Sequence, residues 1–277
     1  MEQRKFGNTG LAVSRLTFGC GAVGGLMTKG DAADQDRAIG WARDHGINFF
    51  DTAASYGNGV SEENLGRALN GNSDGLVIST KVGLSNDDLS DVYGAITRSL
   101  DASLARLRLD HVDIFQLHNT LGRTDFRGTL TIDQIMDAVV PAFDKLRDTG
   151  KVRFLGFTAK GEADDVHKLV SCGVFHSAQV FYNLLVPSAG EPIAANYPSD
   201  DYKLLLETAK AHGVGAIGVR VLAGGALSGS TARHPLGMRD VTPIGSETDY
   251  ATDVKRGLAF MPLVKAGHAG SLIELAI

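Results

Sequence analysis

The chain has 277 residues, 43% of them hydrophobic and 21% charged, a composition typical of a globular protein with a large core. The net charge of −5 and the lack of a long Lys or Arg run argue against nucleic acid as a partner. No apolar run approaches the length of a membrane span, and the N-terminus "MEQRKFGNTG" lacks a signal-peptide core. We therefore expect a cytoplasmic protein, in which Cys20 and Cys172 are small buried hydrophobes rather than a disulfide or metal pair.

Short β-rich runs alternate with longer helical patterns along the whole chain. After a hairpin over residues 4–13 that turns at residues 8–10, we predict strands at 15–20, 47–51, 76–82, 112–118, 152–157, 177–182 and 215–222. Between them, residues 89–107 place apolar side chains at helical spacing, and Ser61 is predicted to cap the helix that follows the second strand. Nearly all-apolar strands at these intervals predict parallel strands covered on both faces, and hence one α/β barrel domain, 1–277.

A closed eight-stranded barrel needs one more strand than this pattern supplies. Residues 271–277, "SLIELAI", have the pattern of the helix that would precede it. We therefore expect a (β/α)₈ TIM barrel that lacks the eighth strand and final helix, with open edges on the first and seventh strands. Truncation of a longer polypeptide is the favoured explanation, and a partner or rearrangement that covers the gap is the alternative.

Residues 19–24, "GCGAVG", match the Gly-x-Gly-x-x-Gly pattern of an open dinucleotide-binding sheet. That motif requires its third glycine to open a helix. Here a Gly- and Lys-containing loop follows, and the helical pattern begins near Asp31. We therefore favour the barrel over the open sheet.

Four ionisable residues follow three consecutive predicted strands. Asp51 ends the second strand and Tyr56 lies just beyond it, Lys81 ends the third, and His118 ends the fourth. Active sites of parallel α/β barrels lie at the C-terminal ends of the strands, so these side chains are predicted to be neighbours on one rim. Each alone has an ordinary explanation as a solvated loop residue or a structural histidine, but four on adjacent strands are harder to explain in that way.

The four side chains suit carbonyl reduction, or the reverse alcohol oxidation, without a metal. A free phenol has a pKa of about 10, and a nearby ammonium is expected to lower it. A carboxylate can orient the Lys, and a His can donate a hydrogen bond that polarises a carbonyl oxygen. No side chain carries a hydride, so a cofactor must supply it.

Five stretches resemble the signatures of the aldo-keto reductases, in that family's order. They are "DTAASYGNGVSEENLGRAL", "VISTKVG", "RSLDASLARLRLDHVDIFQLH", "GKVRFLGFT" and "AQVFYNLL". The resemblance implies a (β/α)₈ barrel that binds NADPH or NADH, with Tyr56 as general acid/base. It further implies that Lys81 and Asp51 tune Tyr56 and that His118 orients the carbonyl of a small-molecule carbonyl or alcohol substrate.

The resemblance also implies a set of cofactor contacts, and NADPH rather than NADH. Gln179 matches a glutamine that holds the nicotinamide carboxamide, Thr158 stands where a serine is usual, and Ala159 replaces a frequent Asn. Arg220 occupies the place of an aromatic platform, where it could stack on the nicotinamide or form a salt bridge elsewhere. The full predicted set is Gly21, Asp51, Thr158, Gln179, Arg220, Ala223 and Gly225, the last two beside the pyrophosphate.

Two other functions stay open at this point. The same family includes nucleotide-binding regulatory subunits that sense redox state for a partner, and the 277-residue form could be an inactive fragment of a reductase. Substrate selectivity is expected from loops 23–31, 119–131 and 223–250, with Phe126, Arg127, Leu227 and Met238 as examples of their side chains.

Overall fold

A seven-stranded parallel sheet forms the centre of the computed structural model, which describes residues 1–123, 128–246 and 248–277. The strand order is β11-β10-β9-β6-β5-β4-β3. The strands are β3 (Phe18–Gly19), β4 (Phe49–Asp51), β5 (Val77–Val82), β6 (Val112–Leu117), β9 (Val152–Ala159), β10 (Ser177–Phe181) and β11 (Gly215–Val219). All seven predicted strands are confirmed. Because the order follows the chain without the reversal of a doubly wound sheet, the open dinucleotide-binding fold is excluded.

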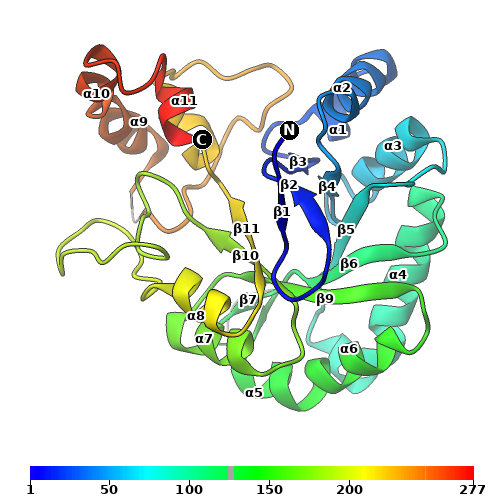
Figure 1. Cartoon of the computed structure of the whole chain (residues 1–277). Helices are drawn as coiled ribbons and strands as arrows, with labels where there is room; N and C mark the ends of the chain where they lie inside the picture. Colours follow the sequence, from blue (N-terminus) through cyan, green and yellow to red (C-terminus); the bar gives the residue numbers. More distant parts are fainter. Residues whose placement is uncertain (124–127, 247) are drawn as a thin grey trace.

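Helices cover the outer face of this curved sheet (Figure 1). They are α2 (Ala32–Asp44), α3 (Val60–Leu69), α4 (Val92–Leu107), α6 (Val140–Arg147), α7 (Ala163–Ser171) and α8 (Leu205–Ala211). The short segments are α1 (Leu26–Lys29), a 3₁₀ turn (Asp87–Ser90), α5 (Ile132–Gln134), a π-helical turn (Ile135–Val139) and a 3₁₀ segment (Ala223–Ser228). The chain ends with α9 (Tyr250–Leu258), α10 (Met261–Lys265) and α11 (Leu272–Ala276), which lie beyond β11. No helix in the described part of the chain is both long and apolar enough to cross a membrane.

The N-terminal hairpin packs against one end of the sheet. Its strands, β1 (Gln3–Lys5) and β2 (Ala12–Ser14), pair antiparallel as predicted. Phe6 and Val13 are buried against Phe49 and Ile114, and the rings of Phe6 and Phe49 meet edge to face at 5.7 Å. Since Phe49 begins β4, the hairpin fills the N-terminal end of the sheet, and the C-terminal ends of the strands are left for the site.

The sheet does not close. Strands β3 and β11 are its edges, and a groove of about 1370 Å³ lies along β11, lined also by the hairpin, residues 15–17 and α11. The sheet is therefore an incomplete (β/α)₈ barrel, and the expectation of seven strands with two open edges is confirmed for the described residues. That residues 1–277 form one domain stays a prediction.

Two details differ from what the sequence predicts. Helix α3 begins after Gly59, a left-handed residue with φ of 93°, and Ser61 lies inside the helix with its hydroxyl buried. That hydroxyl donates to the carbonyl of Cys20 at 2.9 Å and lies 2.9 Å from the hydroxyl of Thr52. The capping role predicted for Ser61 is therefore wrong, because its hydroxyl joins the helix to the sheet. Of the selectivity examples, Leu227 is buried in the core, and Phe126 and Arg127 lie outside the described residues.

Candidate active site

The structure brings the four predicted catalytic residues together at the C-terminal end of the sheet. Asp51 is the last residue of β4, Lys81 lies in β5, and His118 directly follows β6. Tyr56 lies in the turn that leads from β4 to α3, and its ring meets that of His118 edge to face at 5.7 Å. Three neighbouring parallel strands thus present an acid, a phenol, an ammonium and an imidazole to one place.

The ammonium of Lys81 connects the acid to the phenol. Its side chain is fully buried, and its Nζ donates to Asp51 Oδ2 at 2.6 Å, to the carbonyl of Thr52 at 2.7 Å and to Tyr56 Oη at 3.4 Å. An ammonium has three N–H donors, so these three bonds satisfy it completely. A fixed positive charge is therefore held beside the phenol oxygen.

The pKa values of this pair depend on burial and charge together. Burial alone would lower the pKa of Lys81, but the negative charge of Asp51 and the contacts with Tyr56 raise it above its ordinary value. Burial raises the pKa of Tyr56 as well, and the opposing effect of Lys81 does not outweigh it. Lys81 lowers the phenol pKa as predicted, but desolvation is the larger effect, so the pKa of Tyr56 lies above its ordinary value. A phenol in this state is protonated at neutral pH.

His118 is neutral in this site. Burial and the positive charge of Lys81 lower its pKa to about 4. Its Nδ1 lies 3.3 Å from the hydroxyl of Ser55, and its backbone N–H donates to the carbonyl of Val82 at 2.8 Å. If Nδ1 accepts from Ser55, the proton is on Nε2, which can then donate to a carbonyl oxygen.

Two buried residues that hold Asp51 were missed at the sequence level. Asp51 Oδ1 accepts hydrogen bonds from Ser79 Oγ and from Gln116 Nε2, the second at 3.1 Å. Ser79 pairs with Asp51 across β4 and β5, and Gln116 pairs with Lys81 across β5 and β6. Polar residues inside otherwise apolar strands were the available signal, since they must find partners when buried.

Two of the predicted cofactor residues have buried polar atoms without a partner. Thr158 and Gln179 are opposite each other on β9 and β10, with 6% and 3% of their surface exposed. Thr158 Oγ1 and Gln179 Nε2 make no hydrogen bond within the described residues. Buried polar atoms are normally satisfied, so this pair fits a ligand with an amide group. Ala159 offers no side-chain hydrogen bond beside them.

The other predicted cofactor residues follow β11 or precede α1. Arg220 and Ala223 have positive φ values of 60° and 48°, and Gly225 has φ of 111°, so the loop makes tight left-handed turns. The N–H groups of Ala223 and Gly225 donate to Arg220 O and Leu222 O within these turns. Gly21 lies beside the Tyr56 ring, since a Cβ there would be 3.8 Å from it. In the described part of the chain Arg220 forms no salt bridge, so its other predicted role, stacking, stays a prediction.

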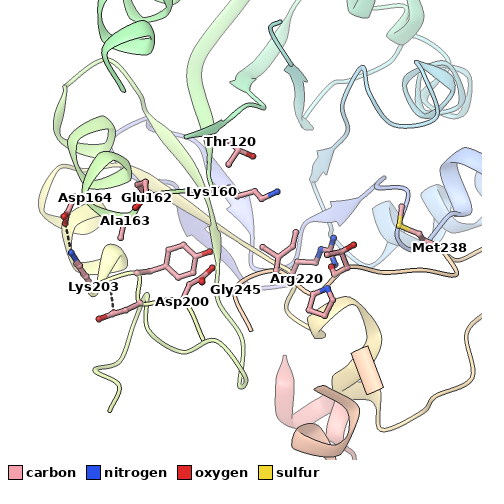
Figure 2. A pocket seen from close by; sticks show the side chains of 16 residues that line it. Thr120, Lys160, Glu162, Ala163, Asp164, Asp200, Lys203, Arg220, Met238 and Gly245 are labelled. Carbon is pink, nitrogen blue, oxygen red and sulfur yellow. Dashed lines mark hydrogen bonds and ion pairs between the residues drawn. The ribbon is translucent and has the colours of Figure 1, made fainter. Parts of the chain in front are cut away.

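A pocket of about 870 Å³ lies near these four residues, but none of the four lines it. Figure 2 shows the residues that do. Its walls come from Thr120, two residues after His118, from the loop after β9, and from the loop after β11. Met238, one of the predicted selectivity residues, also lines it. Lys160, which directly follows β9, is a further lining residue that the sequence did not single out.

Comparison with known proteins gives one family. Residues 15–262 match the model of the Aldo/keto reductase family. L-galactose dehydrogenase of Arabidopsis thaliana is 39% identical over 165 residues, 57% of this chain and 48% of that protein. Aldo-keto reductase yakc [NADP(+)] of Schizosaccharomyces pombe is 27% identical, over 65% of this chain and 52% of that protein.

One further relative and one solved structure match a larger part of the chain. A putative voltage-gated potassium channel subunit beta of Schizosaccharomyces pombe is 32% identical over 240 residues, 82% of this chain and 63% of that protein. The structure of aldo-keto reductase AKR11C1 from Bacillus halodurans, in its holo form, superposes with a TM-score of 0.65. That likeness is at 25% identity and covers 88% of this chain and 74% of that one. The chain spans about half the length of the first two curated relatives.

Proposed function

Because the chain belongs to the aldo/keto reductase family, we propose that it is an NAD(P)H-dependent oxidoreductase that reduces an aldehyde, ketone or sugar-like carbonyl, or oxidises the alcohol. The observation that carries the proposal is the buried Lys81, whose ammonium joins Tyr56 Oη to Asp51 at the C-terminal end of the sheet. A reducing, cytoplasmic setting belongs to the proposal, and both cysteines, Cys20 and Cys172, are free thiols.

Each of the four residues has a role in this reaction. Tyr56 is protonated at neutral pH and donates its proton to the oxygen of the carbonyl as that oxygen becomes an alcohol. Lys81 stabilises the phenolate that remains, and Asp51 holds Lys81 in place. His118, which is neutral, donates a hydrogen bond to the same carbonyl oxygen and polarises it.

A nicotinamide cofactor supplies the hydride when it is bound, since no side chain can. Thr158 and Gln179 would hold its carboxamide with the two unpartnered buried atoms. Arg220 would lie against its ring, Gly21 and Asp51 would lie near its reactive end, and the loop at Ala223–Gly225 would lie beside the pyrophosphate. The Schizosaccharomyces pombe relative yakc carries NADP(+) in its name, which supports NADPH over NADH.

Replacing Thr158 by Val tests this cofactor placement. Valine keeps the shape of the side chain and removes the unpartnered hydroxyl, so we expect unfolding free energy in the absence of cofactor to stay unchanged or to rise by about 1 kcal/mol. The affinity for NADPH should fall by about tenfold, the effect of one lost hydrogen bond. Fluorescence titration with NADPH and urea unfolding measure the two quantities.

Ser177→Ala is the matched control for this variant. Ser177 Oγ is also buried and unpartnered among the described residues, but Ser177 is the first residue of β10, two positions before Gln179. Ser177→Ala should therefore leave NADPH affinity unchanged. Equal affinities in the wild type and in Thr158→Val would contradict the assignment of Thr158.

Carbonyl reduction itself is tested by turnover of the wild-type chain. With NADPH and a panel of aldehydes, ketones and aldoses, we expect absorbance at the wavelength of NADPH to fall at a rate that depends on the carbonyl compound. Product alcohol identified by mass spectrometry should match the NADPH consumed. NADPH binding without turnover of any compound would contradict an enzymatic function.

Binding of NADPH without turnover of any carbonyl compound would favour a second candidate function, a nucleotide-binding regulatory subunit. The specific observation behind this candidate is the 32% identity to a putative voltage-gated potassium channel subunit beta over 82% of this chain. The buried, fully bonded Lys81 beside a protonated Tyr56 instead favours an enzyme, because a subunit that only binds nucleotide does not need a proton donor.

A further inference from the structure

Two cations line the pocket near the four catalytic candidates and have no carboxylate partner among the residues that the structure describes. Lys160 directly follows β9 and Arg220 directly follows β11, and both side chains are half-buried. Within the described ranges neither side chain forms a salt bridge. The Arg220 guanidinium donates one hydrogen bond there, to the carbonyl of Thr242 at 3.4 Å, and the Lys160 ammonium donates none. A cation in a pocket wall that has no carboxylate partner among the described residues is available to bind an anion from outside the chain.

Both cations lie within electrostatic range of the catalytic candidates. Burial and the positive charge of Lys81 are the main causes of the lowered pKa of His118, and the positive charge of Lys160 adds to them. Burial lowers the pKa of Arg220, and Tyr56 opposes that shift. Lys160 and Arg220 line the same pocket as Thr120, which lies two residues after His118.

The rest of the pocket limits where an anion can bind. Its other charged residues are Glu162, Asp164, Asp200, Asp201 and Lys203. Lys203 donates to Asp164 at 2.7 Å, and Figure 2 shows this pair on the opposite side of the pocket from Arg220. The pocket therefore has an acidic side and a cationic side, and an anion would be repelled from the first and attracted to the second.

We propose that Lys160 and Arg220 form a subsite for a carboxylate carried by the substrate, so that the chain acts on carbonyl compounds that bear a carboxylate. This inference rests on the proposed reductase function. A carboxylate is preferred to a cofactor phosphate as the occupant because Lys160 shares its wall with Thr120, on the His118 side of the pocket. The loop expected beside the pyrophosphate, Ala223–Gly225, follows Arg220 in the chain and is not among the residues that line this pocket. The plane of the Arg220 guanidinium can lie against the nicotinamide ring while its N–H edge donates, so Arg220 and the Lys160 ammonium can each give a charge-assisted hydrogen bond to one carboxylate.

The test compares two aldehydes that differ in charge and by one methyl group, 4-carboxybenzaldehyde and its methyl ester. Both are assayed with the wild type, Lys160→Met, Lys160→Arg and Lys203→Met. For Lys160→Met we expect KM for the acid to rise about tenfold to a hundredfold, with kcat little changed and the ester unaffected. Lys160→Arg should recover most of the loss. Lys203→Met, which changes a paired lysine of the same pocket, should resemble the wild type for both compounds. The preference of the wild type for the acid should also weaken as salt is added.

Calorimetric titration of the product alcohol 4-(hydroxymethyl)benzoate into each variant, with NADP⁺ present, separates binding from reaction. Weaker binding by Lys160→Met than by the wild type supports the subsite, even if neither aldehyde is reduced and the reductase function itself fails. Equal binding by the two proteins overturns the subsite. An equal loss of activity toward the acid and the ester in Lys160→Met also overturns it, because a general catalytic or structural role would then explain Lys160.

Discussion

Tyr56→Phe should lower kcat for carbonyl reduction by about a hundredfold to ten-thousandfold, the usual contribution of a positioned proton donor. The phenol oxygen is the atom within 3.4 Å of Lys81 Nζ, and phenylalanine removes that oxygen while keeping the ring. Because the ring remains packed against His118, NADPH affinity and unfolding free energy should change little. Single-turnover kinetics with NADPH and an aldehyde measure the chemical step directly.

The pH dependence of the wild type gives a second measurement of the same role. Burial raises the pKa of Tyr56, so the protonated donor needed for reduction persists through neutral pH, and the rate should fall only as pH rises through that raised value. Alcohol oxidation needs the phenolate, so its rate should rise over the same range. In Tyr56→Phe, neither the fall of the reduction rate nor the rise of the oxidation rate with pH should remain. The matched control is Tyr93→Phe, on outer helix α4, where the ring packs under Lys145. A Tyr56→Phe enzyme with wild-type turnover would show that another group donates the proton.

Most of the fold follows from sequence pattern because the central strands are buried on both faces. Every residue of β5 and β6 is buried, and the intervals between the strands leave room for one helix each. The position of Ser61 could not be obtained in this way. A Ser near a helix start usually caps the helix. Here the helix begins after the left-handed Gly59, and the Ser61 hydroxyl instead donates a hydrogen bond to the carbonyl of Cys20, 41 residues earlier.

The catalytic candidates were predictable for a topological reason, and their surroundings were not. Consecutive parallel strands end on one rim, so Asp51, Lys81 and His118 had to be neighbours once the strands were recognised. Whether the phenol pKa rises or falls depends on how much water reaches Tyr56, which no spacing in the sequence encodes. Lys160 was missed for a similar reason, since a Lys after a strand is usually solvated, and only the folded pocket shows that its ammonium has no carboxylate partner in the described part of the chain.

Lys81→Met should have the largest effect on stability, a loss of about 3–5 kcal/mol of unfolding free energy, and should also reduce turnover strongly. The substitution leaves the carboxylate of Asp51, 8% exposed, buried without its cation, and it leaves the carbonyl of Thr52 without the Lys81 donor. Urea unfolding of the two proteins at neutral pH measures the difference. Lys151→Met is the control, because Lys151 pairs with Asp101 at the surface and such pairs contribute about 1 kcal/mol or less.

The double variant Asp51→Asn with Lys81→Met separates the two roles of this lysine. Asparagine removes the unpaired buried charge and still accepts from Ser79 Oγ, so part of the lost stability should return. Turnover should not return, because the positive charge that stabilises the phenolate of Tyr56 is still missing. Recovery of turnover together with stability would mean that Lys81 acts only as a structural ion-pair partner, and the proposed electrostatic role beside Tyr56 would then be wrong.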